Sequence, residues 1–242
     1  ASRVLGFVRD MMIAGTVGAG PVADAFFVAF KLPNFFRRLS AEGAFTAAFV
    51  PMVAGRFAVD GREAAVAFAE RTLSVMLFVL LGFLIVMELA MPVAMYAFAP
   101  GFADRPETFA LAVELTRITF PYLIFVSLVA LLGGVLNALD RFAAMAAAPI
   151  LLNVVLIGAL LYLVPWVPTA GHALAIGVTV SGVAQLLALI IALRRAGIRI
   201  RLPRPRLTPG IRRLFRLMLP AALGAGVVQV NMVVDVVLAS LL

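Results

Sequence analysis

The 242-residue chain has no cysteine, one histidine and one lysine. Without cysteine it forms neither a disulfide nor a thiolate metal site. His172 stands alone in a predicted outer loop, and a single imidazole is not a metal site. The only lysine, Lys31, also argues against a seven-helix protein that binds retinal. Charge is scarce as well: 13% of the residues are charged, against about a quarter in ordinary soluble domains.

The residues that are present are mostly apolar, with 64% hydrophobic residues and a mean hydropathy of +1.12. Several apolar runs reach the roughly 20 residues that a helix needs to cross a bilayer, and they lack the two-residue alternation of β-barrel strands. The sequence therefore predicts an all-α polytopic membrane protein. Its seven apolar segments span about 3–17, 22–36, 72–99, 109–139, 142–164, 173–193 and 214–242.

These segments divide the chain into an N-terminal transmembrane lobe of about six helices over 1–194, a basic loop over 195–213 and a seventh helix over 214–242. Between the first two segments, glycines and Pro21 predict a tight turn over 18–21. The stretch 40–71 combines charged residues with apolar ones at a spacing of four, and we expect an amphipathic helix at the cytoplasmic membrane interface. The chain starts without methionine and stops inside an apolar run, so we expect both ends to continue.

Arginine is distributed unevenly among the loops. The loops after the second, fourth and sixth segments hold almost all of the loop arginines, nine of them between 194 and 216, whereas the opposite side offers mainly Arg105. By the positive-inside rule the first group of loops is cytoplasmic, and so is the N-terminus. This topology already accounts for the net charge of +8, and we therefore expect membrane lipids, and no nucleic acid, as partners.

The first two segments are short and carry an unusual number of charges for membrane spans. These charges are Arg3, Arg9, Asp10, Asp24, Lys31, Arg37 and Arg38. An arginine in mid-bilayer costs roughly 2.5–3.5 kcal/mol, so we expect these side chains to face the protein interior. Two interpretations stay open: a cationic cavity for an anionic cargo such as a diphosphate, or ion pairs Arg9–Asp10 and Arg3–Asp24 that only fix helix packing.

For other polar residues in the apolar segments we predict structural or secondary roles. Glu114 and Arg117 are three residues apart and are expected to pair with each other. Asp235 is a candidate cation or proton site. No motif for covalent chemistry is present, so we predict no catalytic residues and no enzyme activity.

Specific motifs resemble the opening of the MviN/MurJ-type lipid II flippase family. They are SRVLGFVRD at 2–10, ADAFFVAFKLPN at 23–34, Arg37-Arg38, AEGAF at 41–45 and AFVP at 48–51. The resemblance is strong over about the first sixty residues, and the later segments match in hydropathy and spacing.

This resemblance implies a multidrug/oligosaccharidyl-lipid/polysaccharide exporter fold, in which two lobes alternately open a central cavity to each side of the bacterial inner membrane. The implied cargo is lipid II, moved to the outer leaflet for peptidoglycan synthesis. Family members have fourteen spans, and this chain would end in the seventh. The site residues implied are Arg3, Arg9 and Arg37 for the diphosphate, Asp24 as functionally important, and Ser2, Asp10 and Asn34 at further motif positions.

No cofactor is implied, and dependence on membrane potential or on a coupling cation remains open. The alternatives are an exporter of another polyprenyl-diphosphate saccharide or of drugs, a seven-helix receptor, and a membrane scaffold that transports nothing. The receptor would require an external N-terminus, opposite to the arginine bias. A site for cationic drugs would need acidic residues, whereas the first two segments are rich in arginine.

Overall fold

The computed structural model describes residues 2–38 and 45–241, with side chains described up to 220 and at a few positions beyond. All regular elements within these ranges are helices, as expected. They are α1 (Ser2–Val17), α2 (Pro21–Arg37), α3 (Thr46–Val59), α4 (Gly61–Phe98), η2 (Pro100–Phe102), α5 (Pro106–Thr119), α6 (Tyr122–Asn137), α7 (Ala143–Tyr162), η3 (Val164–Trp166), α8 (Ala170–Arg195) and α9 (Pro209–Leu241).

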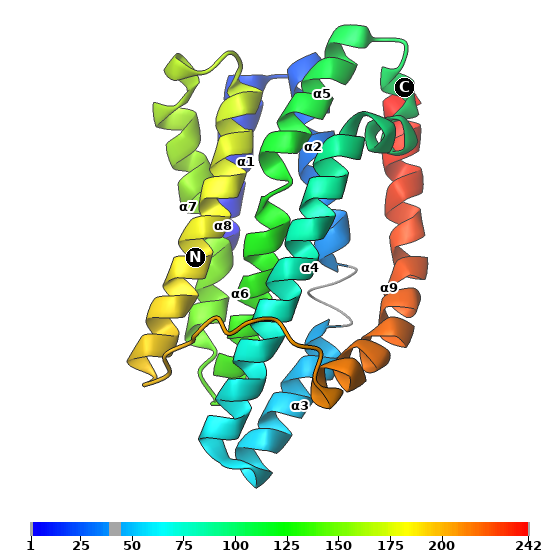
Figure 1. The fold of residues 1–242 in the computed structure, drawn as a ribbon. Coiled ribbons are helices and arrows are strands. Elements are labelled where there is room, and N and C mark those ends of the chain that lie inside the picture. The colour runs from blue at the N-terminus through cyan, green and yellow to red at the C-terminus, as the bar shows by residue number, and fades with distance from the viewer. Residues whose placement is uncertain (1, 39–44, 242) are drawn as a thin grey trace.

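The long helices run roughly along one direction and form a bundle (Figure 1). The α3–α4 turn, the α6–α7 loop and the linker between α8 and α9 lie toward one end, and the α1–α2 turn and η3 lie toward the other (Figure 1). Within the described ranges, four helical segments are long and apolar enough to cross a membrane: α4, α5 with α6, α7 and α8. The chain is therefore a multi-pass membrane protein by fold.

The α1–α2 turn forms where glycine and proline predict it. Helix α1 ends at Val17, Gly18 adopts a φ of 68°, and Pro21 opens α2. Glycine tolerates this positive φ because it has no Cβ, and proline fits a first helical turn because the N–H that it lacks would have no partner there. The two short, charged helices are thereby held antiparallel.

The expected single segment over 109–139 is two helices, α5 and α6. The break falls at Phe120 and Pro121, because proline lacks the N–H that would continue the α-helical ladder. The Ile118 carbonyl beside the break accepts a hydrogen bond from Thr179 Oγ1 of α8 at 2.5 Å. This hydrogen bond ties α8 to α5 at the break.

Helix α6 occupies the centre of the bundle. It packs against α2, α3, α4, α7 and α8, and nearly all of its side chains are buried. A helix that is apolar all round is typical of a protein core or of a membrane span. Two cavities flank α6, one toward α1, α2 and α7 and one toward α4.

The expected interfacial helix over 40–71 differs from the structure. Residues 40–44 lie outside the described ranges, α3 ends at Val59, and a new helix begins at Gly61. The apolar stripe packs inside the bundle: Phe45, Phe49 and Val53 are at most 2% exposed and join the core with α4 and α6. A stripe at a spacing of four shows which face is apolar, but it does not show whether lipid or protein covers that face.

Candidate functional site

A cavity of about 610 Å³ lies between α1, α2, α6, α7 and α8. Its charged lining residues are Arg9, Lys31, Arg37 and Arg38, and its other polar lining residues are Asn34, Thr46, Tyr122 and Gln185. Among the described residues, no aspartate or glutamate lines it. Cations gathered in an apolar bundle without lining acids favour an anionic ligand.

Arg9 is held from two sides at the α1 wall of this cavity. Its Nη1 donates a hydrogen bond to Asn153 Oδ1 of α7 at 2.9 Å, and its Nε and Nη2 donate to Asp10 Oδ1 at 2.9 and 2.7 Å. The Arg9 side chain is 21% exposed and that of Asp10 64%. A guanidinium has five N–H donors, so these three contacts leave one hydrogen on each Nη for a ligand.

Asn34 and Arg37 form a second polar group at the α2 wall. Arg37 Nε donates to Asn34 Oδ1 at 3.1 Å, and Asn34 Nδ2 donates to the Phe30 carbonyl at 2.8 Å. The amide therefore orients the guanidinium while its own N–H is satisfied by the helix. Both side chains are partly buried and line the same cavity as Arg9.

The local shape of α2 depends on Pro33, which lies inside the helix. Proline cannot donate to the carbonyl four residues earlier, which here belongs to Ala29. Thr119 Oγ1 of α5 donates to that carbonyl at 2.9 Å. This contact ties α2 to α5 directly beside the turn that carries Asn34 and Arg37.

Four of the predicted site residues do not line the cavity. Ser2 contributes its backbone carbonyl, which accepts a hydrogen bond from Asn153 Nδ2 at 3.2 Å. Asp10 acts through Arg9, as described above. Arg3 and Asp24 are exposed, and within the described ranges no ion pair joins them. Of the two packing pairs considered, only Arg9–Asp10 is formed.

Sequence reasoning missed Asn153 and Gln185, which are 5% and 3% exposed. Asn153 bridges Arg9 and the Ser2 carbonyl, and Gln185 lines the cavity with a buried Nε2 that has no hydrogen-bond partner among the described groups. Each is an isolated polar residue in a long apolar helix. That isolation is the signal by which they are detectable, because an amide without a partner is costly in such surroundings.

The expected Glu114–Arg117 pair is wrong. Arg117 Nε donates to the Glu88 carbonyl of α4 at 3.3 Å and lies 4.0 Å from the Glu88 carboxylate. Glu114 instead lies 3.3 Å from His172 Nε2. His172 is not in a loop but buried in the first turn of α8, where Nδ1 lies 2.9 Å from Thr169 Oγ1. The side chain of Asp235 lies outside the described residues.

The cavity is suited to binding an anion. Its guanidinium groups stay charged when desolvated and donate paired hydrogen bonds to phosphate oxygens. In the part of the chain that the structure describes, no three His, Cys, Asp or Glu residues gather as a metal site.

Comparison with known proteins connects this geometry to one family. The family model described as lipid II flippase MurJ matches residues 13–242. A probable lipid II flippase MurJ of Rhizobium tropici is 47% identical over 99% of this chain and 46% of its own length. The lipid II flippase MurJ of Burkholderia cenocepacia is 38% identical over 99% of this chain and 47% of its own length.

A solved structure shares the fold. It is titled lipid II flippase MurJ in an inward closed conformation, superposes with a TM-score of 0.76 and is 23% identical. The match covers 99% of this chain and 49% of that one. The chain thus spans about half the length of the relatives that it matches.

Proposed function

Because this chain belongs to the lipid II flippase MurJ family, we propose that it forms the cargo-binding lobe of a flippase in the bacterial inner membrane. In this proposal the protein carries lipid II from the cytoplasmic to the outer leaflet for peptidoglycan synthesis. The observation that carries the proposal is the cavity lined by Arg9, Lys31 and Arg37 with no lining acid among the described residues. The role is transport, not catalysis.

The proposed contact is between the diphosphate and two oriented guanidinium groups. Asn153 and Asp10 hold Arg9 of α1, Asn34 holds Arg37 of α2, and both guanidinium groups line the cavity. Side chains already fixed by hydrogen bonds lose little entropy when they bind, so the diphosphate meets a preorganised site. Lys31 adds a further positive charge from the α2 wall.

Arg3 and Asp24 take a different place in the proposal. Both are exposed on α1 and α2, and charged side chains are costly against lipid. We assign them to the surface that faces a second lobe, where they would meet cargo or the opposite wall when the lobes change position. Transport follows by alternating access, in which one lobe rocks against the other around the bound headgroup.

The same cavity disfavours export of cationic drugs, because such a cargo needs acidic lining residues and the described lining has none. Other polyprenyl-diphosphate saccharides share the group that the arginines recognise, so the experiment includes undecaprenyl diphosphate, which presents that group without a saccharide, as a competitor. Membrane potential acts on a charge with about 2.3 kcal/mol per 100 mV. We therefore propose that the potential, alone or with a coupling cation, drives the return of the empty cationic cavity.

The test is lipid binding by native mass spectrometry with the complete gene product, using lipid II, undecaprenyl diphosphate and cardiolipin in competition. Truncating one partner of a desolvated charge pair costs 2 kcal/mol or more, so Arg9→Gln and Arg37→Gln should each weaken lipid II binding about thirtyfold or more. Arg141→Gln is the matched control, because Arg141 is exposed in the α6–α7 loop and does not line the cavity. Unchanged selectivity for lipid II over cardiolipin in both cavity variants would contradict the proposal.

A further inference from the structure

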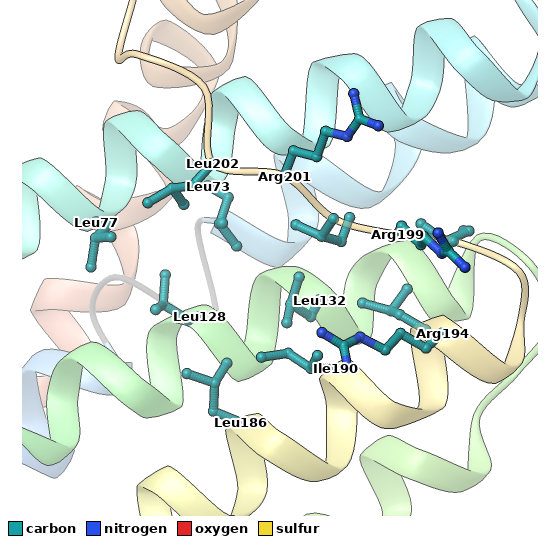
Figure 2. A pocket seen from close by; sticks show the side chains of 13 residues that line it. Leu73, Leu77, Leu128, Leu132, Leu186, Ile190, Arg194, Arg199, Arg201 and Leu202 are labelled. Atoms are coloured by element: carbon teal, nitrogen blue, oxygen red, sulfur yellow. The ribbon is translucent and has the colours of Figure 1, made fainter.

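A second cavity, of about 820 Å³, lies on the other side of α6 (Figure 2). Helices α4 and α8 both pack against α6, and the cavity lies between them with α6 as its floor. The beginning of the α8–α9 linker, residues 198–202, closes one end. None of its lining residues belongs to the cavity of Arg9 and Arg37. We call this second cavity the α4–α8 groove.

The floor and walls of the α4–α8 groove are made almost entirely of leucine and isoleucine. Figure 2 shows Leu128 and Leu132 of α6 between Leu73 and Leu77 of α4 and Leu186 and Ile190 of α8. Such a surface binds hydrocarbon, since it offers no hydrogen-bonding group to a polar ligand. A free phosphate or a nucleotide would find no partner along it.

One end of the α4–α8 groove is strongly basic. Arg194 of α8 extends over the leucine floor, and Arg199 lies beside it on the linker (Figure 2). Arg201, also part of the lining, points away toward α4 (Figure 2). All three are exposed, and the described lining contains no acid. The nearest carboxylate that the structure ties to this end is Glu70, which accepts a hydrogen bond from the Arg201 backbone N–H at 2.7 Å.

The linker is fixed where it crosses the α4–α8 groove. Arg62 Nη2 donates to the Ala196 carbonyl at 2.6 Å, Glu70 accepts from Arg201, and Ile198 is 2% exposed in the core. Two hydrogen bonds to α4 side chains and one buried side chain therefore fix the backbone on both sides of Arg199. The basic end is a built part of the structure and not a passing arrangement of a loose chain.

We propose that the α4–α8 groove is a binding site for an anionic glycerophospholipid. One acyl chain lies on the floor of Leu128 and Leu132, and the phosphate is held by Arg194 and Arg199. Charge complementarity selects this occupant, because an apolar trough with cations at one end matches a molecule with a hydrocarbon chain and a terminal anion. The basic end also lies with the arginine-rich loops, where anionic headgroups of the cytoplasmic leaflet gather.

The bound lipid would serve as a structural ligand that links α4, α8 and the linker. It occupies a surface different from that of the transported cargo, so it binds whether or not the cargo cavity is filled. Because each arginine near an anionic surface strengthens lipid binding about fivefold, loss of two should weaken it about 25-fold.

The experiment is native mass spectrometry of the complete gene product titrated with dioleoyl phosphatidylglycerol, dioleoyl phosphatidylcholine or undecaprenyl diphosphate. The test variant is Arg194→Gln/Arg199→Gln, and the matched control is Arg204→Gln/Arg206→Gln, which removes the same charge from exposed linker positions outside the groove. A third variant, Ile190→Trp, fills the trough without changing charge. Circular dichroism confirms that each variant is folded.

We expect phosphatidylglycerol to bind more tightly than phosphatidylcholine, with the preference lost in the test variant and kept in the control. Ile190→Trp should weaken both phospholipids. If the test and control variants lost this preference equally, the effect would come from the overall charge of the linker, and the proposed site would be wrong. If the test variant lost its binding of undecaprenyl diphosphate and kept its binding of phosphatidylglycerol, the groove would be a cargo site and the proposal would also be overturned.

Discussion

Asn153 offers a way to separate the stability of the bundle from its binding of anions. Its side chain is 5% exposed, accepts from Arg9 Nη1 at 2.9 Å and donates to the Ser2 carbonyl at 3.2 Å. Asn153→Leu keeps the volume and removes both bonds. Hydrogen bonds between membrane helices average about 0.6 kcal/mol with a maximum near 1.7, and bonds to charged groups reach about 1.5–3. We therefore expect a loss of about 1–3 kcal/mol in unfolding free energy.

Asn153→Asp changes the charge of the site. The new carboxylate keeps an acceptor for Arg9 and adds an ion pair, but it loses the donor to the Ser2 carbonyl and is desolvated at a 5% exposed position, so we expect a loss of about 1–3 kcal/mol in unfolding free energy here too. The same carboxylate repels a bound diphosphate. At about 6 Å and an effective dielectric constant of about 20, one pair of like charges costs about 3 kcal/mol, which corresponds to about a hundredfold in affinity.

The two variants are compared by thermal unfolding in detergent and by native mass spectrometry with undecaprenyl diphosphate, using the complete gene product. Both variants should melt below the wild type, and at a temperature where both are folded Asn153→Asp should bind the diphosphate about a hundredfold more weakly than the wild type. A folded Asn153→Asp protein with wild-type affinity would refute the assignment of the Arg9 cavity to an anion. A normally stable Asn153→Leu protein would show instead that the bridge between α1 and α7 contributes little.

Three further predictions test packing, orientation and energetics. Gly177→Ala should cost about 1–3 kcal/mol of stability, because its Cβ would lie 2.8 Å from the Ala159 Cβ. Gly158→Ala has open space at its Cβ and should be neutral or stabilising by up to about 1 kcal/mol. Thermal unfolding distinguishes the two variants, and equal changes in stability would contradict the packing of α7 against α8. With cysteine introduced at Arg204 or Asp104, an impermeant maleimide should label the first only from the cytoplasm and the second only from outside; the reverse pattern would contradict the topology. Collapsing the membrane potential in proteoliposomes should slow lipid II transport, because about 2.3 kcal/mol per charge per 100 mV would be lost; a voltage-insensitive rate would exclude electrical driving.

The sequence predicts an element well where a local signal marks its boundary. The α1–α2 turn lies at its predicted position because glycine and proline act within a few residues. The segment predicted over 109–139 is one candidate span, but the break between α5 and α6 inside it was missed although Pro121 is visible, because an unbroken apolar run surrounds the proline. The Glu114–Arg117 pair failed for a related reason. Spacing along one helix says nothing about Glu88 and His172 on neighbouring helices, which are the partners that tertiary packing supplies.

The candidate site shows the same limit. Arg9, Asn34 and Arg37 are conspicuous because charge and amide groups are rare in apolar helices, and the structure brings them to one cavity. What holds them could not be inferred in the same way. Asn153 is 144 positions from Arg9, and Thr119 reaches Ala29 across 90 positions. Such contacts depend on which helices are neighbours, and no periodicity within a single helix encodes that.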